Sequence, residues 1–245
     1  MRCIYVSPHF DDAVLSCGGL IWEQVQKGMP VEIWTVCAGD APPGPLSALA
    51  KASHQQWNIE AAEDLVPVRR IENQEAATLV GAETVNFSIP DCIYRRSSAA
   101  DLLYPTDVFV PIHTDEKNLD AEIAGSLTSE LQPDDVIISP LAIGGHVDHV
   151  LTRLAAEHLN RPIRYYADIP YLIKNPEMLV PATKGLIGTL YPISENGLGI
   201  WQESIAAYAT QILMLFDTRE KMQNAIRIYW ENQRGVQLWN AIFNN

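Results

Sequence analysis

Cysteine is scarce in this sequence, and the few cysteines present are far apart. Four occur in 245 residues, at Cys3, Cys17, Cys37 and Cys92, and no two of them form a Cys-x-x-Cys pair. This spacing argues against a thiolate zinc site and against a disulfide framework. Cys3 and Cys37 stand in apolar runs and are expected in the core.

Long apolar runs and an excess of positive charge are also missing. No run reaches the roughly 20 apolar residues that a membrane-spanning helix needs, and no signal peptide is apparent. Asp and Glu outnumber Lys and Arg by 30 to 17, which gives a formal net charge of −13. Proteins that bind nucleic acid or anionic membranes normally carry the opposite sign. We therefore expect neither partner, and we expect a cytoplasmic protein.

Three common active-site motifs are absent as well. Gly18-Gly19 follows the first apolar run, but the sequence has no G-x-G-x-x-G, no P-loop and no G-x-S-x-G. The usual phosphate loops of nucleotide-binding proteins and the nucleophile elbow of serine hydrolases are thereby excluded.

What the chain does have is an alternation of strand-like and helix-like segments. This rhythm is typical of an α/β fold, here a Rossmann-like three-layer sandwich with a mostly parallel sheet. The expected strands are residues 3–7, 31–39, 84–90, 135–141 and 163–170. The expected helices are residues 18–28, 48–65, 69–81, 117–132 and 150–160.

The rhythm loosens after about residue 170, although the composition does not change. We expect one domain over 1–245, with a core of about 1–170 and a C-terminal helical and strand extension of about 171–245. The extension should hold a strand at 184–193 and helices at 201–216 and 219–233. The proline-rich segment 40–53 begins as a loop that is long enough to cover a site.

Two polar clusters stand where strands of this sheet should end. His9, Asp11 and Asp12 follow the first strand, and His146, Asp148 and His149 follow the fourth. Ligands of open α/β sheets bind beyond the carboxyl ends of the strands, so the clusters can meet. A catalytic zinc takes three ligands from His, Asp or Glu and leaves one position for water. His9, Asp12 and one histidine of the second cluster would supply these three ligands. A neighbouring carboxylate could act as a general base.

Each cluster also has a plainer interpretation. Asp11 and Asp12 could cap the following helix, and His146 and His149 could be surface residues at a helix start. His113 and Asp115 form a third pair, for which we favour a solvated loop over a second metal site.

Both clusters resemble signatures of the PIG-L/LmbE-like family of zinc-dependent de-N-acetylases. The first reads Pro8-His9-Phe10-Asp11-Asp12, with Phe10 in place of the usual proline, and the second reads His146-Val147-Asp148-His149. Weaker similarities are Arg69-x-x-Glu72, Gly81 and Asp91.

The resemblance implies a role for each position. His9, Asp12 and His149 would bind Zn²⁺ or another divalent metal, Asp11 would be the general base, and His146 would stabilise or protonate the intermediate. Asp148 would orient a histidine, and Arg69 and Asp91 would contact substrate. For the last two, a surface salt bridge and a turn residue are equally good interpretations.

The function that the resemblance implies is metal-dependent hydrolysis of an N-acetyl or N-acyl amino sugar or glycoconjugate. The alternatives are an amidohydrolase acting on a non-sugar N-acyl metabolite and a non-catalytic sugar-binding protein. A homo-oligomer is also expected from the resemblance.

Overall fold

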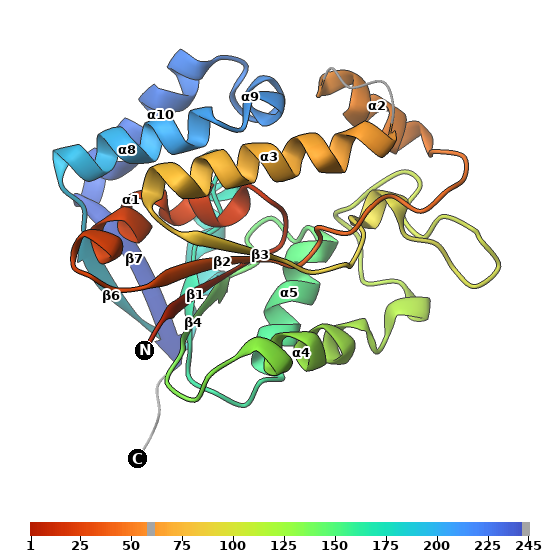
Figure 1. Ribbon diagram of the computed structural model, residues 1–245, viewed down its shortest axis with the longest axis horizontal. Coiled ribbons are helices and arrows are strands. Elements are labelled where there is room, and N and C mark those ends of the chain that lie inside the picture. The colour runs from red at the N-terminus through yellow and green to blue at the C-terminus, as the bar shows by residue number, and fades with distance from the viewer. Residues whose placement is uncertain (58–61, 242–245) are drawn as a thin grey trace.

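The computed structural model (Figure 1) describes residues 1–57 and 62–241, which include a seven-stranded sheet of order β3-β2-β1-β4-β5-β7-β6. The strands are β1 (Cys3–Ser7), β2 (Val31–Thr35), β3 (Glu83–Asn86), β4 (Val136–Pro140), β5 (Ile163–Tyr166), β6 (Leu186–Pro192) and β7 (Gly235–Ala241). The first five are parallel, and β7 runs antiparallel to both β5 and β6. The α/β expectation with a mostly parallel sheet is confirmed.

Helices cover both faces of this sheet (Figure 1). One face carries α1 (Asp12–Gln26), α3 (Ala62–Val80), α8 (Glu195–Ala206) and α10 (Arg219–Gln233). The other carries α4 (Leu119–Glu130) and α5 (Val147–Glu157). The shorter elements are α2 (Ala48–Gln56), η1 (Cys92–Tyr94), η2 (Thr114–Glu116), α6 (Tyr171–Lys174), η3 (Pro176–Met178), α7 (Leu179–Ala182) and α9 (Ala209–Phe216).

The core is split by the sheet, as strand periodicity requires. Along β1, Cys3 and Tyr5 point into the cluster beneath α1 and α8, and Ile4 and Val6 point into the cluster beneath α5. Successive side chains of a strand face opposite sides, so an entirely apolar strand belongs in a sheet that is covered on both faces. β1 therefore lies at the centre of the molecule, and its carboxyl end opens toward the site.

The glycine pair after β1 serves packing. A Cβ atom on Gly18 would lie 2.6 Å from Cδ1 of Trp201 in α8. The missing side chain lets α1 and α8 approach closely, and the indole Nε1 of Trp201 donates to the carbonyl of Val14 at 2.8 Å.

Several expected boundaries are wrong. The first helix begins at Asp12 rather than residue 18, so its first turn carries site residues. The expected strands 31–39 and 84–90 end at Thr35 and Asn86. Of the expected helix 48–65, α2 ends at Gln56, residues 58–61 lie outside the described part, and 62–65 belong to α3.

The extension also differs from expectation. The single helix expected at 201–216 is two helices, α8 and α9. Tyr208 between them has φ −80° and ψ 62°, and its hydroxyl donates to the Phe10 carbonyl at 2.9 Å, which holds the chain out of helical geometry. β7 was not expected; it lies inside the sheet, between β5 and β6.

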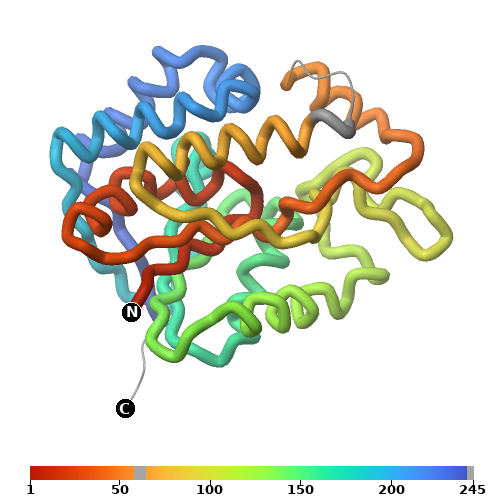
Figure 2. The backbone as a smooth tube through the Cα atoms, in the orientation of Figure 1, coloured from red at the N-terminus to blue at the C-terminus, as the bar shows by residue number. Residues whose placement is uncertain are grey.

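Two long connections gather on one side of the molecule (Figure 2). They are the segment from β2 through α2 and the segment from β3 to α4, and a hydrogen bond of 2.6 Å joins His54 Nε2 to the Tyr94 hydroxyl across them. Within the described residues, no helix is long and apolar enough to cross a membrane.

Candidate active site

The two polar clusters meet at the carboxyl ends of the adjacent strands β1 and β4. His9 lies in the loop after β1, Asp12 begins α1, and His149 lies in the first turn of α5. One ligand atom from each of these three residues lies within 4.8 Å of the other two, and all three residues are buried. The expected convergence of the two distant segments is thus observed.

The carboxylate of Asp12 is the centre of this group. Its Oδ2 accepts from the backbone N–H of His9 at 2.8 Å and lies 3.2 Å from His9 Nδ1 and 3.4 Å from His149 Nε2. Neither aspartate caps the helix: Asp11 at the N-cap makes no side-chain cap, and the Ala13 N–H donates instead to Ser7 Oγ at 3.0 Å. The capping interpretation is wrong.

A buried chain of charged groups fixes the other side of His9. Its Nε2 lies 3.0 Å from Asp148 Oδ2, which also accepts from the Cys92 N–H at 3.0 Å. Asp148 Oδ1 accepts from Arg95 Nη1 at 2.5 Å, and both carboxylate oxygens of Glu116 accept from the same guanidinium. Because an ionised carboxylate only accepts, His9 donates from Nε2 to Asp148; in a neutral imidazole the Nδ1 lone pair then faces Asp12 and His149. The structure thus places Asp148 within hydrogen-bond distance of a ring nitrogen of His9.

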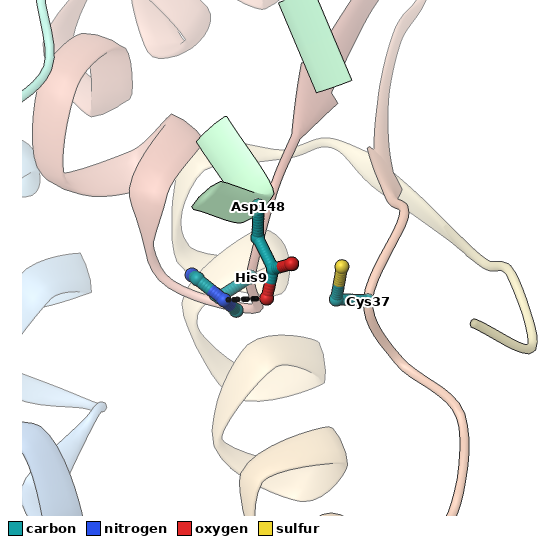
Figure 3. A group of neighbouring side chains, drawn as sticks. All are labelled: His9, Cys37 and Asp148. Carbon is teal, nitrogen blue, oxygen red and sulfur yellow. Dashed lines mark hydrogen bonds and ion pairs between the residues drawn. The ribbon is translucent and has the colours of Figure 1, made fainter. Parts of the chain in front are cut away.

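Two cysteines approach the same region but are weaker candidate ligands. Cys37 can join His9 and Asp148, and Cys92 can join His146 and Asp148, in groups of similar compactness. Figure 3 shows the first group, with Asp148 joined to His9 and the Cys37 thiol beyond the carboxylate. Burial raises the pKa of both thiols well above its usual value. Asp148 already faces His9, Cys92 and Arg95, whereas Asp12 lies between two imidazoles, so the group around Asp12 has the better donor set.

Sequence reasoning missed Asp168, which holds the third residue of that set. Asp168 lies two residues beyond β5 and is buried. Its Oδ1 lies 2.7 Å from His149 Nδ1, and its Oδ2 accepts from the Ile143 N–H at 2.9 Å. A proton on Nδ1 leaves the Nε2 lone pair of His149 directed at the group. No strand-end signal marked it in the sequence, because Asp168 falls inside the expected strand 163–170, whereas β5 ends at Tyr166.

Arg95 and Glu116 were missed for a different reason. Both lie in the irregular segment between β3 and α4, where no strand or helix period marks them. They are buried charged residues, and only the folded chain brings them behind Asp148.

His146 sits at the N-cap of α5. Its Nδ1 accepts from the Asp148 N–H at 3.2 Å, so a neutral imidazole carries its proton on Nε2. Burial, and then the neighbouring charge of His9, holds the pKa of His146 well below its usual value. His146 lines the site cavity and is buried, as is His149, so the surface interpretation of this pair is wrong.

Arg69 connects α3 to the site. Its Nη2 donates to Asp11 Oδ1 at 3.0 Å, and its guanidinium carbon lies 5.6 Å from the Phe10 ring centroid and 5.4 Å from that of Trp57. Burial raises the pKa of Asp11, while the charge of Arg69 opposes that shift. The Arg69 side chain is only 8% exposed, so the surface salt bridge is not what the structure has.

Asp91 borders the same cavity, of about 210 Å³. It does serve as a turn residue, because its Oδ1 accepts from the Ile93 N–H at 3.2 Å, and its Oδ2 lies 3.7 Å from His9 Nε2. His113 is half-buried, Asp115 is exposed, and neither lines this cavity; the segment expected as a loop is the short helix η2, which His113 caps.

These features define an α/β protein with a buried histidine–carboxylate group at the strand ends. Residues 4–160 match the family described as PIG-L, GlcNAc-PI de-N-acetylase, and the chain belongs to this family of N-deacetylases. It is 26% identical over 263 residues to 2'-N-acetylparomamine deacetylase of Niallia circulans, covering 96% of this chain and 92% of that protein.

Two solved deacetylase structures are similar over nearly their whole length. The zinc-inhibited form of teicoplanin deacetylase is 26% identical with a TM-score of 0.85, covering 98% of this chain and 97% of that chain. The A40926 pseudoaglycone deacetylase is 28% identical with a TM-score of 0.80 and the same coverage.

Proposed function

We propose that this protein is a divalent-metal-dependent N-deacetylase that converts an N-acetylated amino sugar of a glycoconjugate to the free amine and acetate. The main observation behind this proposal is the group formed by His9, Asp12 and His149. One ligand atom of each lies within 4.8 Å of the other two, and the residues come from both family signatures. Deacetylation of amino-sugar antibiotics by similar proteins supports the substrate class.

The residues of this group fit Zn²⁺. Two neutral imidazoles and one carboxylate are a usual catalytic zinc set. Asp148 and Asp168 fix one ring nitrogen of each histidine, which leaves His9 Nδ1 and His149 Nε2 to face Asp12. A bound cation supplies Lewis acidity, which lowers the pKa of water toward neutrality and polarises a carbonyl.

Asp11 is the general base of this proposal. It borders the cavity beside Asp12 but is outside the ligand set, and burial keeps its pKa raised. It accepts a proton from the attacking water as the new C–O bond forms, and it returns that proton to the nitrogen as the C–N bond breaks. Arg69 holds the carboxylate in place.

His146 donates from Nε2 to the oxygen of the acetamide carbonyl. Its Nδ1 is occupied by the backbone of Asp148, which fixes the orientation of the ring. A preplaced donor of this kind contributes most when negative charge develops on the oxygen, typically about 10²–10³-fold in rate.

The test is metal quantification on the purified protein, followed by release of acetate from N-acetyl amino sugars at one equivalent of Zn²⁺, Co²⁺, Ni²⁺ or Mn²⁺. We expect one divalent ion per chain and no turnover after chelation, with recovery on adding it back. A protein that binds no divalent ion at micromolar concentration would contradict the proposal. Turnover confined to N-acyl compounds without a sugar would favour the alternative amidohydrolase.

A further inference from the structure

The cavity of the site has two chemically different zones. Its floor holds the histidines and carboxylates described above. The remaining lining is mainly apolar and includes Leu49 of α2, Trp57, Phe109, and Met214 and Leu215 of α9, which we call the rim; Ser53 and Gln211 also line the cavity. Helix α9 belongs to the C-terminal part of the chain, beyond the matched family range of 4–160. Two of the five rim residues therefore come from the C-terminal extension.

Each described carboxylate that lines the cavity already has a partner. Asp11 is paired with Arg69 at 3.0 Å, and Asp12 lies between His9 and His149. Asp91 accepts from a backbone N–H and lies 3.7 Å from His9 Nε2. The apolar rim itself holds no carboxylate, so burying several ammonium groups against it would be costly.

Two side chains that line the cavity carry an N–H group that is unpartnered within the described part of the chain. Trp57 Nε1 and Arg69 Nε are buried and make no hydrogen bond to any described residue, and both side chains line the cavity. Trp57 is 7% exposed and Arg69 is 6% exposed. Buried N–H groups normally have an acceptor, and sugar oxygens would supply one here.

We infer, on the basis of the proposed function, that the substrate is an N-acetyl amino sugar bearing an apolar aryl or alkyl aglycone, and not a polycationic aminocyclitol. The sugar lies between the floor and the two donors, and the aglycone packs against the rim formed by α2 and α9. The C-terminal extension thus contributes to substrate selection through Met214 and Leu215.

The first experiment compares metal-loaded wild-type protein on free N-acetylglucosamine, its phenyl and octyl glycosides, and an N-acetylated paromamine. We expect kcat/KM for the better glycoside to exceed that for the free sugar by about tenfold or more, since one buried apolar group contributes at least that factor. The phenyl and octyl arms distinguish aryl from alkyl aglycones. A preference for the aminocyclitol, or equal kcat/KM for glycosides and free sugar, would overturn the inference.

A second measurement does not need turnover. Binding of octyl glucosaminide and of glucosamine, both already deacetylated, is compared by calorimetry on the metal-loaded protein. We expect the octyl compound to bind about tenfold more tightly or better. If the octyl compound binds more tightly but no substrate is deacetylated, the proposed activity fails and the inferred substrate class stands. If the two compounds bind equally well, the inferred substrate class is refuted.

Variants of α9 give a matched pair. Met214→Ser should lower kcat/KM for the octyl glycoside about tenfold more than for free N-acetylglucosamine, through KM, because Met214 lines the rim. Leu213→Ser is the control on the same helix, since Leu213 is 59% exposed and does not line the cavity. Equal effects of the two variants, with melting temperatures unchanged, would contradict the inference.

Discussion

Removing the Arg95 guanidinium should affect stability and metal binding separately. The Arg95 side chain is 6% exposed and stands between the carboxylates of Asp148 and Glu116, which are 0% and 6% exposed. Arg95→Met leaves two buried carboxylates without their cation. Breaking a buried pair in this way costs about 3–5 kcal/mol of unfolding free energy. Urea unfolding of the metal-free protein measures that loss.

The same variant should bind metal about 10–100-fold more weakly, as is usual when a partner of a ligating histidine is disturbed. The reason is that Asp148 without Arg95 takes up a proton more readily and holds the Nε2–H of His9 less firmly. A competition titration with a chromophoric chelator measures the affinity. Adding Glu116→Gln should restore about 1–3 kcal/mol of stability, because one uncompensated charge is removed, but it should not restore metal affinity.

An exposed ion pair provides the control for both measurements. Arg219→Met breaks a pair with Glu203 whose side chains are 55% and 52% exposed, and it should cost less than about 1 kcal/mol and leave metal affinity unchanged. A folded Arg95→Met protein with wild-type metal affinity would refute the role given to Asp148. A double variant as unstable as the sum of the single changes would refute the coupling.

Three further predictions concern single side chains. Asp11→Asn should keep the metal and lose about 10²–10⁴-fold in kcat, and near wild-type kcat in the acetate-release assay would exclude it as the base. His149→Ala should lower the metal content after dialysis, whereas full retention would remove it from the ligand set. Asp135→Asn should destabilise the protein at pH 7: burial raises the pKa of Asp135, but the Arg2 hydrogen bonds outweigh this and lower it. That stabilisation is complete above the pKa of an unfolded Asp, about 4, and is lost as the pH falls through the lowered folded-state pKa. The difference in urea midpoint should therefore shrink as the pH falls below about 4; a constant difference would contradict the assignment.

Asp168, which contacts His149, adds a third strand end to the site. Asp148 follows β4, and Asp168 follows β5, so the two histidines are oriented by carboxylates from different segments. Because a histidine ligand needs its second nitrogen fixed, the site depends on the sheet holding β1, β4 and β5 in register. That dependence explains why the polar groups are buried in the centre of the molecule.

Periodicity in the sequence was enough for the parallel part of the sheet and for most helices, but not for β7. The apolar run of β1 and the helix at 219–233 follow from local patterns that tertiary contacts do not override. The helix breaks were not predictable in this way. The break at Tyr208 depends on a hydroxyl that reaches the carbonyl of Phe10, almost two hundred residues away in the chain, and no local pattern encodes that contact.

The same distinction between local sequence pattern and tertiary contact applies to the candidate site. The sequence by itself determined the residues that belong to the two motifs, since His9, Asp12 and His149 occupy strand-end positions that any parallel sheet brings to one edge. Only the tertiary structure decided which nitrogen of each histidine faces the group, because Asp148, Arg95 and Asp168 act through hydrogen bonds between remote segments. It also decided that Met214 and Leu215 of α9 contribute to the cavity rim. From the sequence alone, a short apolar helix is expected to pack in the core.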